Sequence, residues 1–351
     1  MNTIKVSVAR DEEILAFLSG TEWRGEQPRP LAGDASNRRY LRLNGKLGPA
    51  VLMDAPPEKG EDVTPFVAVT DWLRAQGFSA PEVYAVDAAR GILLLEDLGD
   101  SLFARHLAET PSDQTLVYEA AVDTLVELSG FKAPPTIGRT AYPLAAYDLS
   151  ILFREACLLT DWWLPVARQD FSSKDLKADY IGTLEPVLKT VAAHRETLVL
   201  RDYHSENLIW LPDRRNTGRV GLLDYQDALA GHAAYDLVSL LEDARRDTLP
   251  DLQDAMLTRF LDRTTEFDAD TFRRDYAILG AQRNLKIIGI FTRLAVRDGK
   301  PGYLDLIPRV WRHQMHDLEH PIWSGLNGWI ASNVPAPDPA TLDRVRAKVT
   351  A

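Results

Sequence analysis

The chain has 351 residues, of which 45% are hydrophobic and 26% are charged, as is usual for a soluble globular protein. Its length exceeds the usual size of a single hydrophobic core and predicts two domains. The formal net charge of −11 argues against nucleic acid or an anionic membrane as the main partner, and one cysteine, Cys157, allows no internal disulfide. No apolar run is long enough to span a bilayer, and the charged residues 1–13 do not resemble a secretory signal. We therefore expect a cytoplasmic protein.

Strand patterns dominate the N-terminal part of the chain. Periodicity and turn residues predict a helix over 10–19, strands over 40–43, 50–53, 83–86 and 91–95, and a helix from an N-cap at Thr64 to Gly77. The acidic stretch 96–100 follows the last of these strands and suits a hinge. We expect a small β-rich domain that ends there.

Residues 31–43 pass from small, turn-forming residues into a strand. A loop of this kind between two strands can fold over phosphate groups, offering backbone N–H groups, Ser36 and the arginines at 38 and 39. It holds a single glycine, so a plain hairpin turn with solvated arginines is the alternative.

The remainder of the chain is predominantly helical in pattern. Helices are predicted from 110–113 to Gly130, over 151–163 and 176–194, and onwards to about residue 325, with a linker over 334–340 before a short terminal helix. Trp162 and Trp163 lie in one of these helices. Such paired aromatic residues are more often core than a sugar-stacking surface.

The stretch 198–211 interrupts this helical pattern with an apolar run, a polar loop and a second apolar run. Asp202 and Asn207 lie in the loop with four residues between them, and a further apolar run over 220–223 ends on Asp224. The turn residues of 212–218 predict that the last two runs pair as a hairpin. The same spacing of Asp and Asn also occurs by chance in ordinary loops. An aspartate that closes a buried strand is an awkward place for a charge, which favours a functional site.

This order of strand, loop, hairpin and aspartate is typical of phosphotransferases of the protein-kinase type. In such enzymes an aspartate of the loop accepts the proton of the attacking hydroxyl. An asparagine of the same loop and an aspartate after the next strand hold Mg²⁺. The pattern therefore assigns Asp202 as the base and Asn207 and Asp224 as metal ligands.

Several motifs occur together with this loop: Gly33-Asp34-Ala35-Ser36, Arg38-Arg39-Tyr40, Met53-Asp54-Ala55-Pro56-Pro57-Glu58, Leu94-Leu95-Glu96-Asp97-Leu98-Gly99-Asp100 and Gln282-Arg283-Asn284-Leu285-Lys286. With them the chain resembles the aminoglycoside phosphotransferase and choline kinase superfamily over nearly its whole length. Within it, the chain is similar to the branch of bacterial cell-wall-recycling kinases that phosphorylate the anomeric hydroxyl of N-acetylmuramate and N-acetylglucosamine.

The resemblance implies an α+β, bilobal, protein-kinase-like fold. Residues 1–97 would form the β-rich N-lobe that covers the nucleotide, and residues 98–351 the mostly helical C-lobe with the catalytic loop, metal site and acceptor site. It implies ATP and Mg²⁺ as cofactors and an amino sugar as substrate. The sugar 1-phosphate product would pass to a uridylyltransferase in peptidoglycan recycling. Asp236 is expected to brace the catalytic loop.

The chain departs from the kinase pattern at Leu200, where a histidine is usual, and at Met53, where a lysine usually clamps the phosphates. The helix after Met53 also lacks the usual glutamate partner of that lysine. A different phosphate clamp is therefore expected, with Arg38 and Arg39 as candidates. The residues predicted to bind the nucleotide are Ser36, Asn37, Arg39, Glu96 and Leu98.

Acceptor contacts are predicted at Glu155, His204, Tyr225, Asp227 and Arg283. Three of these residues have an alternative. Glu155 suits a solvated helix face, and His204 can brace its loop. Arg283 falls three residues before Lys286 on one helix, so the two together can bind a carboxylate of the acceptor. The alternative is that each forms a plain surface salt bridge with an acidic residue.

Two other functions remain open at this point. The first is a kinase for another small hydroxylated acceptor, such as choline, an aminoglycoside or a different sugar. The second is a nucleotide-binding pseudokinase that acts as a partner module. The missing lysine supports the pseudokinase, whereas Asp202, Asn207 and Asp224 argue against it.

Overall fold

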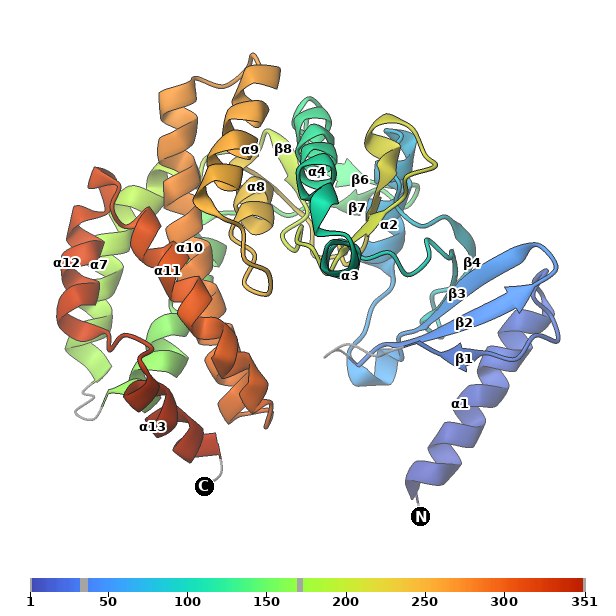
Figure 1. Cartoon of the computed structure of the whole chain (residues 1–351). Coiled ribbons are helices and arrows are strands. Elements are labelled where there is room, and N and C mark those ends of the chain that lie inside the picture. Colours follow the sequence, from blue (N-terminus) through green and yellow to red (C-terminus); the bar gives the residue numbers. More distant parts are fainter. Residues whose placement is uncertain (1, 32–36, 169–172, 350–351) are drawn as a thin grey trace. The chain divides into compact units, whose positions relative to one another are not determined.

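The computed structural model describes residues 2–31, 37–168 and 173–349, and the chain divides into two compact units. The first unit comprises Met1–Leu102, Thr136–Pro143 and Leu208–Asp227, and the second comprises Phe103–Pro135, Leu144–Asn207 and Ala228–Ala351 (Figure 1). The sequence predicted one boundary after residue 97. The structure instead adds two later segments to the first unit.

A five-stranded antiparallel sheet in the order β1-β2-β3-β5-β4 forms the centre of the first unit. The elements of this unit are α1 (Asn2–Ser19), β1 (Arg29–Pro30), β2 (Arg39–Gly45), β3 (Gly48–Asp54), α2 (Thr64–Ala75), β4 (Val83–Asp87), β5 (Ile92–Glu96), β6 (Thr136–Ile137), β7 (Tyr142–Pro143), β9 (Leu208–Trp210) and β10 (Val220–Leu222). All four strands predicted in this part of the chain are confirmed.

Helix α1 packs on the sheet through an apolar stripe. Ile14 and Leu18, one helical turn apart, contact Leu43 of β2, Leu52 of β3 and Leu94 of β5 in one buried cluster. The predicted helix over 10–19 is confirmed and begins earlier, at Asn2. The burial of this stripe fixes α1 to the sheet.

The predicted hairpin is formed by β9 and β10, with Leu208 opposite Leu222. It belongs to the first unit because its backbone is hydrogen-bonded there. The N–H of Trp210 donates to the carbonyl of Ser101 at 2.7 Å, and the N–H of Leu222 donates to the carbonyl of Ser79 at 3.0 Å. These backbone bonds explain why a segment far along the chain joins the N-terminal sheet region.

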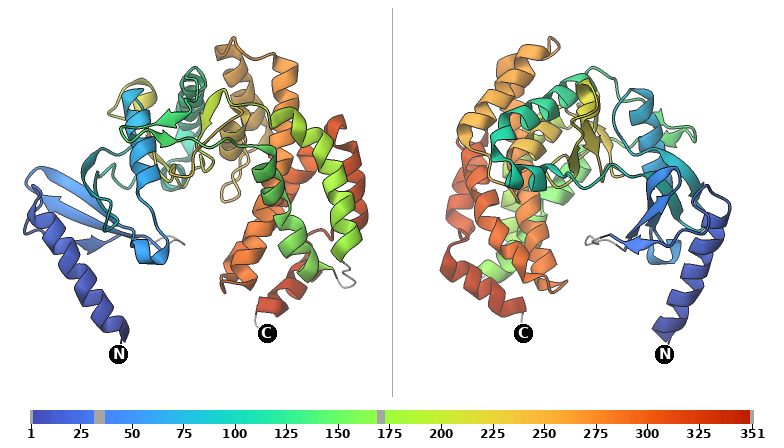
Figure 2. Two further views of the ribbon diagram at one scale, coloured as in Figure 1. Left: turned by 180° about the vertical axis from the view of Figure 1, so that it is seen from behind. Right: turned by 45° about the vertical axis from the view of Figure 1, so that its right-hand side comes forward.

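The second unit is mostly helical and is arranged around α10 (Ala269–Val296), beside which α11 runs (Figure 2). Its other elements are α3 (Phe103–Glu109), α4 (Gln114–Ser129), α5 (Leu149–Ala156), α6 (Leu164–Ala167), α7 (Ser173–Val191), β8 (Thr197–Val199), β11 (Leu229–Gly231), α8 (Ala234–Leu241), α9 (Pro250–Arg263), α11 (Ile307–Asp317), α12 (Ser324–Asn333) and α13 (Pro339–Val349). No helix of the described ranges is both apolar enough and long enough to cross a bilayer.

Two local predictions were wrong, and one strand was missed. Thr64 is the first helical residue of α2 and not its N-cap, and its own N–H donates to the carboxylate of Asp62 at 2.8 Å. The single helix predicted over 151–163 is instead α5 followed by a π-helical turn at Leu159–Trp163. Strand β11, which pairs with β8, was not predicted.

The close approach of α10 to the start of the π-helical turn gives a test of the packing. A methyl group on Gly289 would lie 2.3 Å from the carbonyl carbon of Leu158, which is backbone and cannot rotate away. We expect Gly289→Ala to lower the free energy of unfolding by about 1–3 kcal/mol. Gly328→Ala on α12 is the matched control, because nothing lies within 4 Å of its added methyl group. Chemical denaturation of both variants checks this, and equal stability would contradict it.

Candidate active site

The loop that carries Asp202 leaves β8 and is held at its start by Asp236 of α8. The Asp236 carboxylate is buried and accepts two backbone N–H groups, from Leu200 at 2.6 Å and from Arg201 at 2.8 Å. Burial raises the pKa of Asp236 to about 7, and the two N–H bonds act in the opposite direction. The predicted bracing role of Asp236 is confirmed.

Asp202 and Asn207 lie on this loop with half-buried side chains. Nδ2 of Asn207 donates to the main-chain carbonyl of Asp202 at 3.0 Å, and the Asn207 N–H donates to the carbonyl of His204 at 2.8 Å. Because the amide nitrogen makes the first bond, the other end of the amide is the oxygen that a metal ion needs. The Asp202 carboxylate accepts no hydrogen bond from any other residue that the structure describes.

The middle of the loop is held by Asp243, which follows α8. Its carboxylate accepts the backbone N–H of Ser205 at 3.1 Å and also the Ser205 hydroxyl. His204 beside it is 6% exposed, and burial lowers its pKa to about 4, so the ring is neutral at pH 7. Asp243 was not among the residues predicted from the sequence. Its one signal was an acidic residue directly after an apolar helical run.

Asp224 lies in the first unit, two residues after the end of β10. Its backbone has φ of 57°, a left-handed conformation that is uncommon for residues with a side chain, although aspartate adopts it more often than most. Nε2 of Gln226 donates to one carboxylate oxygen of Asp224 at 2.9 Å. Asp224 therefore lies in a left-handed turn just after the hairpin, and the hydrogen bond from Gln226 orients its carboxylate.

The predicted nucleotide-binding residues of the first unit have different surroundings. Ser36 lies outside the described residues. Nδ2 of Asn37 donates to the carbonyl of Lys59 at 3.3 Å and is exposed. The Glu96 carboxylate accepts Arg214 at 2.5 Å and the N–H of Glu82 at 3.1 Å.

The acidic stretch 96–100 is tied to the sheet by ion pairs. Leu98 is 8% exposed. The carboxylates of Asp97 and Asp100 on either side of it are paired with Arg42 of β2, at 2.6 Å and 2.7 Å. The arginine on the neighbouring strand therefore fixes the hinge to the sheet.

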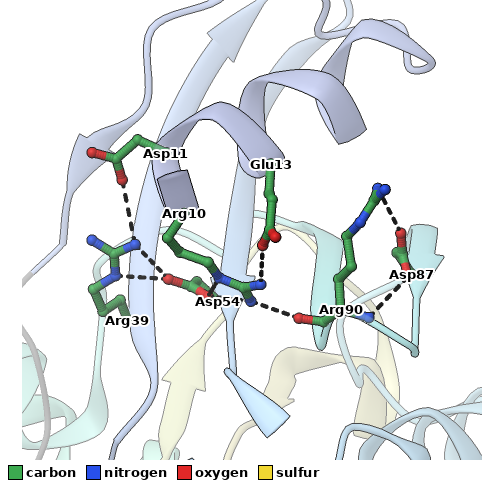
Figure 3. Close-up of polar contacts among 7 residues, drawn as sticks. All are labelled: Arg10, Asp11, Glu13, Arg39, Asp54, Asp87 and Arg90. Carbon is green, nitrogen blue, oxygen red and sulfur yellow. Dashed lines mark hydrogen bonds and ion pairs between the residues drawn. The ribbon is translucent and has the colours of Figure 1, made fainter. Parts of the chain in front are cut away.

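The strand position where kinases carry a lysine is apolar, because Met53 of β3 is fully buried. The next residue, Asp54, is also fully buried, and its carboxylate accepts Arg10 at 2.7 Å and Arg39 at 2.7 Å (Figure 3). The Arg39 side chain is 43% exposed. The second candidate clamp, Arg38, pairs with Glu61 at 2.7 Å.

Two predicted acceptor contacts flank Asp224. Tyr225 is 1% exposed, stacks on Phe66 of α2 and shares a hydrogen bond of 2.7 Å with the hydroxyl of Thr70. Asp227 is exposed. Tyr225 is thus part of the interior of the first unit, and its predicted contact with an acceptor finds no support in its position.

The remaining predicted acceptor residues are buried in the second unit. Glu155 of α5 is 6% exposed and pairs with Arg201 and with Lys286, the latter at 3.2 Å. Arg283 is 4% exposed and donates to the hydroxyl of Ser239 at 2.8 Å. The alternatives of a solvated Glu155 and of plain surface salt bridges for Arg283 and Lys286 are therefore both wrong, because all three side chains are buried.

A cluster of His194, His232 and Asp275 in the second unit has ligand atoms within 4.8 Å of one another, as a metal site would. The N–H of Ala234 donates to Nδ1 of His232 at 3.0 Å, so the neutral ring carries its proton on Nε2. That nitrogen lies 3.2 Å from Asp275. His232 and Asp275 therefore form a buried histidine–carboxylate pair.

A second titratable cluster joins α10 and α11. Nδ2 of Asn284 donates to Glu242 at 2.7 Å and to Asp317 at 3.0 Å. Burial and the charge of Glu242 raise the pKa of Asp317 well above its usual range, so Asp317 keeps a proton and hydrogen-bonds to Glu242. A carboxyl with so raised a pKa makes the stability of the fold depend on pH.

The antiparallel five-stranded sheet followed by a mostly helical region, with the loop of Asp202 and Asn207, defines a phosphotransferase of the protein-kinase-like fold. The GDP complex of an aminoglycoside 2'-phosphotransferase has this fold, with a TM-score of 0.60 and 16% identity over 90% of this chain and 99% of its own. Residues 27–273 match the model of the phosphotransferase enzyme family, and the chain belongs to that family.

Two curated relatives extend over most of the chain. An N-acetylmuramate/N-acetylglucosamine kinase of Caulobacter vibrioides is 36% identical over 94% of this chain and 98% of its own length. A kinase of the same name from Pseudomonas aeruginosa is 34% identical over 81% of each chain. The protein is therefore an enzyme of the kinase class, related to sugar kinases.

The bracing of the loop by Asp236 is open to a direct test. In Asp236→Asn the new amide N–H₂ would face a backbone N–H of Leu200 or Arg201, and the start of the loop would shift. We expect kcat to fall on the order of a hundredfold, because small displacements of a reacting group are expensive. Nucleotide affinity, measured by titration calorimetry, should change little. A variant with wild-type kcat would contradict the bracing role.

The raised pKa of Asp317 predicts a pH effect on stability. The folded protein holds a proton that the unfolded chain releases above about pH 4, so stability falls as the pH rises towards the folded pKa. Asp317→Asn can donate to Glu242 and accept from Asn284, and it removes this loss. Between about pH 5 and pH 8, we expect the free energy of unfolding of the variant to rise relative to that of the wild type by up to ~1 kcal/mol per pH unit. Chemical denaturation at both ends of this range measures the difference. An equal difference at both pH values would contradict this.

Proposed function

We propose that this enzyme transfers the γ-phosphoryl group of ATP to the anomeric hydroxyl of N-acetylmuramate and N-acetylglucosamine, as in peptidoglycan recycling. The observation that carries the proposal is the 36% identity, over nearly the full length of both chains, to a relative named for these two sugars. The product would be a sugar 1-phosphate, a suitable substrate for a uridylyltransferase.

In this proposal Asp202 is the general base. Its carboxylate is half-buried and receives no hydrogen bond from the rest of the described chain, so it can accept the proton of the sugar hydroxyl. An anomeric hydroxyl is more acidic than an ordinary alcohol, so an ionised carboxylate suffices. Phosphoryl transfer has a loose transition state, and most of the rate enhancement comes from positioning and electrostatics.

The residues present suit a magnesium–nucleotide complex. The oxygens of Asn207 and Asp224 are the hard ligands that Mg²⁺ prefers, and the Asn207 amide is oriented by its bond to the Asp202 carbonyl. The ion neutralises charge on the phosphates when it is bound. On the first unit, Asn37, Arg39 and the main chain at Glu96 and Leu98 are the proposed nucleotide contacts, together with Ser36.

Acceptor contacts are proposed at His204 and Asp227. His204 is a neutral ring two residues after the base, and Asp227 is the exposed member of the predicted set. Buried Arg283 donates a hydrogen bond to Ser239, and we propose that it supports the loop of Asp202 through this contact.

Proton-coupled phosphorus NMR tests the reaction directly. Purified protein, ATP and Mg²⁺ are incubated with either sugar. We expect a new resonance coupled to the anomeric proton, which reports the position of the phosphate and the anomer together. Signal from another hydroxyl would indicate a different sugar kinase. Failure with both sugars and with a broad acceptor panel, despite ATP binding, would indicate a pseudokinase.

The assignment of the base is tested by Asp202→Ala. We expect turnover of both sugars to become undetectable, since proton transfer and hydroxyl orientation are both lost, and nucleotide binding to remain near the wild-type level. Initial rates and titration calorimetry measure the two effects. Asp213→Ala, in the turn of the β9–β10 hairpin, is the control for removing an aspartate. Wild-type turnover in Asp202→Ala would remove it from the mechanism.

A further inference from the structure

Arg201, the residue before the proposed base, has φ of 72° and so lies in the left-handed region. This conformation is free of strain for glycine but costs a residue with a side chain about 1–2 kcal/mol. Its backbone is held on both sides. The N–H donates to Asp236 at 2.8 Å, and the carbonyl accepts the hydroxyl of Ser239 at 3.2 Å. An arginine at this position is therefore expected to make side-chain contacts that offset the strain.

The guanidinium of Arg201 is held by Glu155 of α5, 46 residues earlier in the chain. Glu155 receives three further donors, from the hydroxyl of Tyr147, from Lys286 at 3.2 Å and from Gln282 at 3.4 Å. Although burial raises it, the charges of Lys286 and Arg201 lower the pKa of Glu155 to about 2. Glu155 is thus a fixed, ionised acceptor whose oxygens are occupied by protein donors.

This arrangement anchors the residue before the base at its N–H, its carbonyl and its side chain. Asp236 and Ser239 both belong to α8, whereas Glu155 belongs to α5. The backbone bonds alone leave the segment held from one helix. The ion pair adds a second, independent point of attachment, which restricts rotation of the chain on entry to Asp202.

From these contacts we propose that Glu155 is a positioning residue, which acts through the Arg201 side chain to hold the Asp202 carboxylate in its reactive orientation. The inference rests on Asp202 being the base of the proposed function. It replaces the direct contact between Glu155 and the acceptor that the sequence predicted.

Arg201→Gly removes the ion pair with Glu155 but keeps the backbone conformation of residue 201. Glycine keeps the left-handed conformation without strain and leaves Glu155 paired with Lys286, so no buried charge loses its partner. We expect kcat to fall by roughly tenfold to a hundredfold, with little change in the KM for ATP. Wild-type kcat in this variant would overturn the proposal, because the arginine side chain would then be dispensable.

Glu155→Asp retains the charge and withdraws the carboxylate by one methylene. We expect a fall in kcat similar to that of Arg201→Gly. The double variant Glu155→Asp/Arg201→Gly should be no slower than Arg201→Gly alone, since both substitutions break one connection. Multiplying effects would overturn the proposal, because Glu155 would then act independently of Arg201.

Asp123→Asn is the matched control. It removes a carboxylate from another arginine pair of the same unit, with Arg259 at 2.8 Å, between α4 and α9. We expect wild-type kcat, and a comparable loss there would overturn the assignment by showing a general effect of weakened packing. If the wild type phosphorylates neither sugar, the proposed function and this role both fail. Turnover by the wild type with an unaffected Arg201→Gly removes the positioning role alone.

Discussion

The loop that carries Asp202 depends on its hydrogen bonds to the buried carboxylate of Asp236. This carboxylate accepts the first two N–H groups of the loop, which have no strand partner because β8 ends at Val199. Every residue of α8 is buried, so the helix that carries Asp236 is fixed by packing. The loop thereby takes its position from the interior of the second unit.

The loop of Asp202 follows β8 and is held by α8, and these two elements are closely connected. β8 pairs with β11, and only two residues separate β11 from α8. Asp243, just beyond α8, then holds Ser205 in the middle of the loop. One strand pair and one helix therefore determine the backbone on both sides of Asp202, and Arg201 can be kept in its strained conformation.

Local patterns in the sequence predicted the sheet strands, the β9–β10 hairpin and most helices, because each pattern depends on neighbouring residues. Strand β11 was missed because Leu229, Ala230 and Gly231 show neither alternation nor β-branched residues. The proposed roles of Asp202, Asn207 and Asp224 were likewise predictable, because the three residues lie close together in the sequence. The partners of Glu155 were not, because Arg201 and the α10 residues Gln282 and Lys286 come from two distant segments, and a charged helical residue is solvated in most proteins.

The same limit applies to the first unit, where the sequence showed a missing lysine but not what surrounds its position. Met53 is core, and the fully buried Asp54 beside it requires counter-ions, which Arg10 and Arg39 supply. The Arg10 side chain is 11% exposed and that of Arg39 is 43% exposed. A phosphate can therefore reach Arg39 more readily, and it would meet a guanidinium already oriented by Asp54. In the proposed nucleotide site, an arginine oriented by a buried carboxylate would therefore replace the mobile, strongly hydrated ammonium of a clamping lysine.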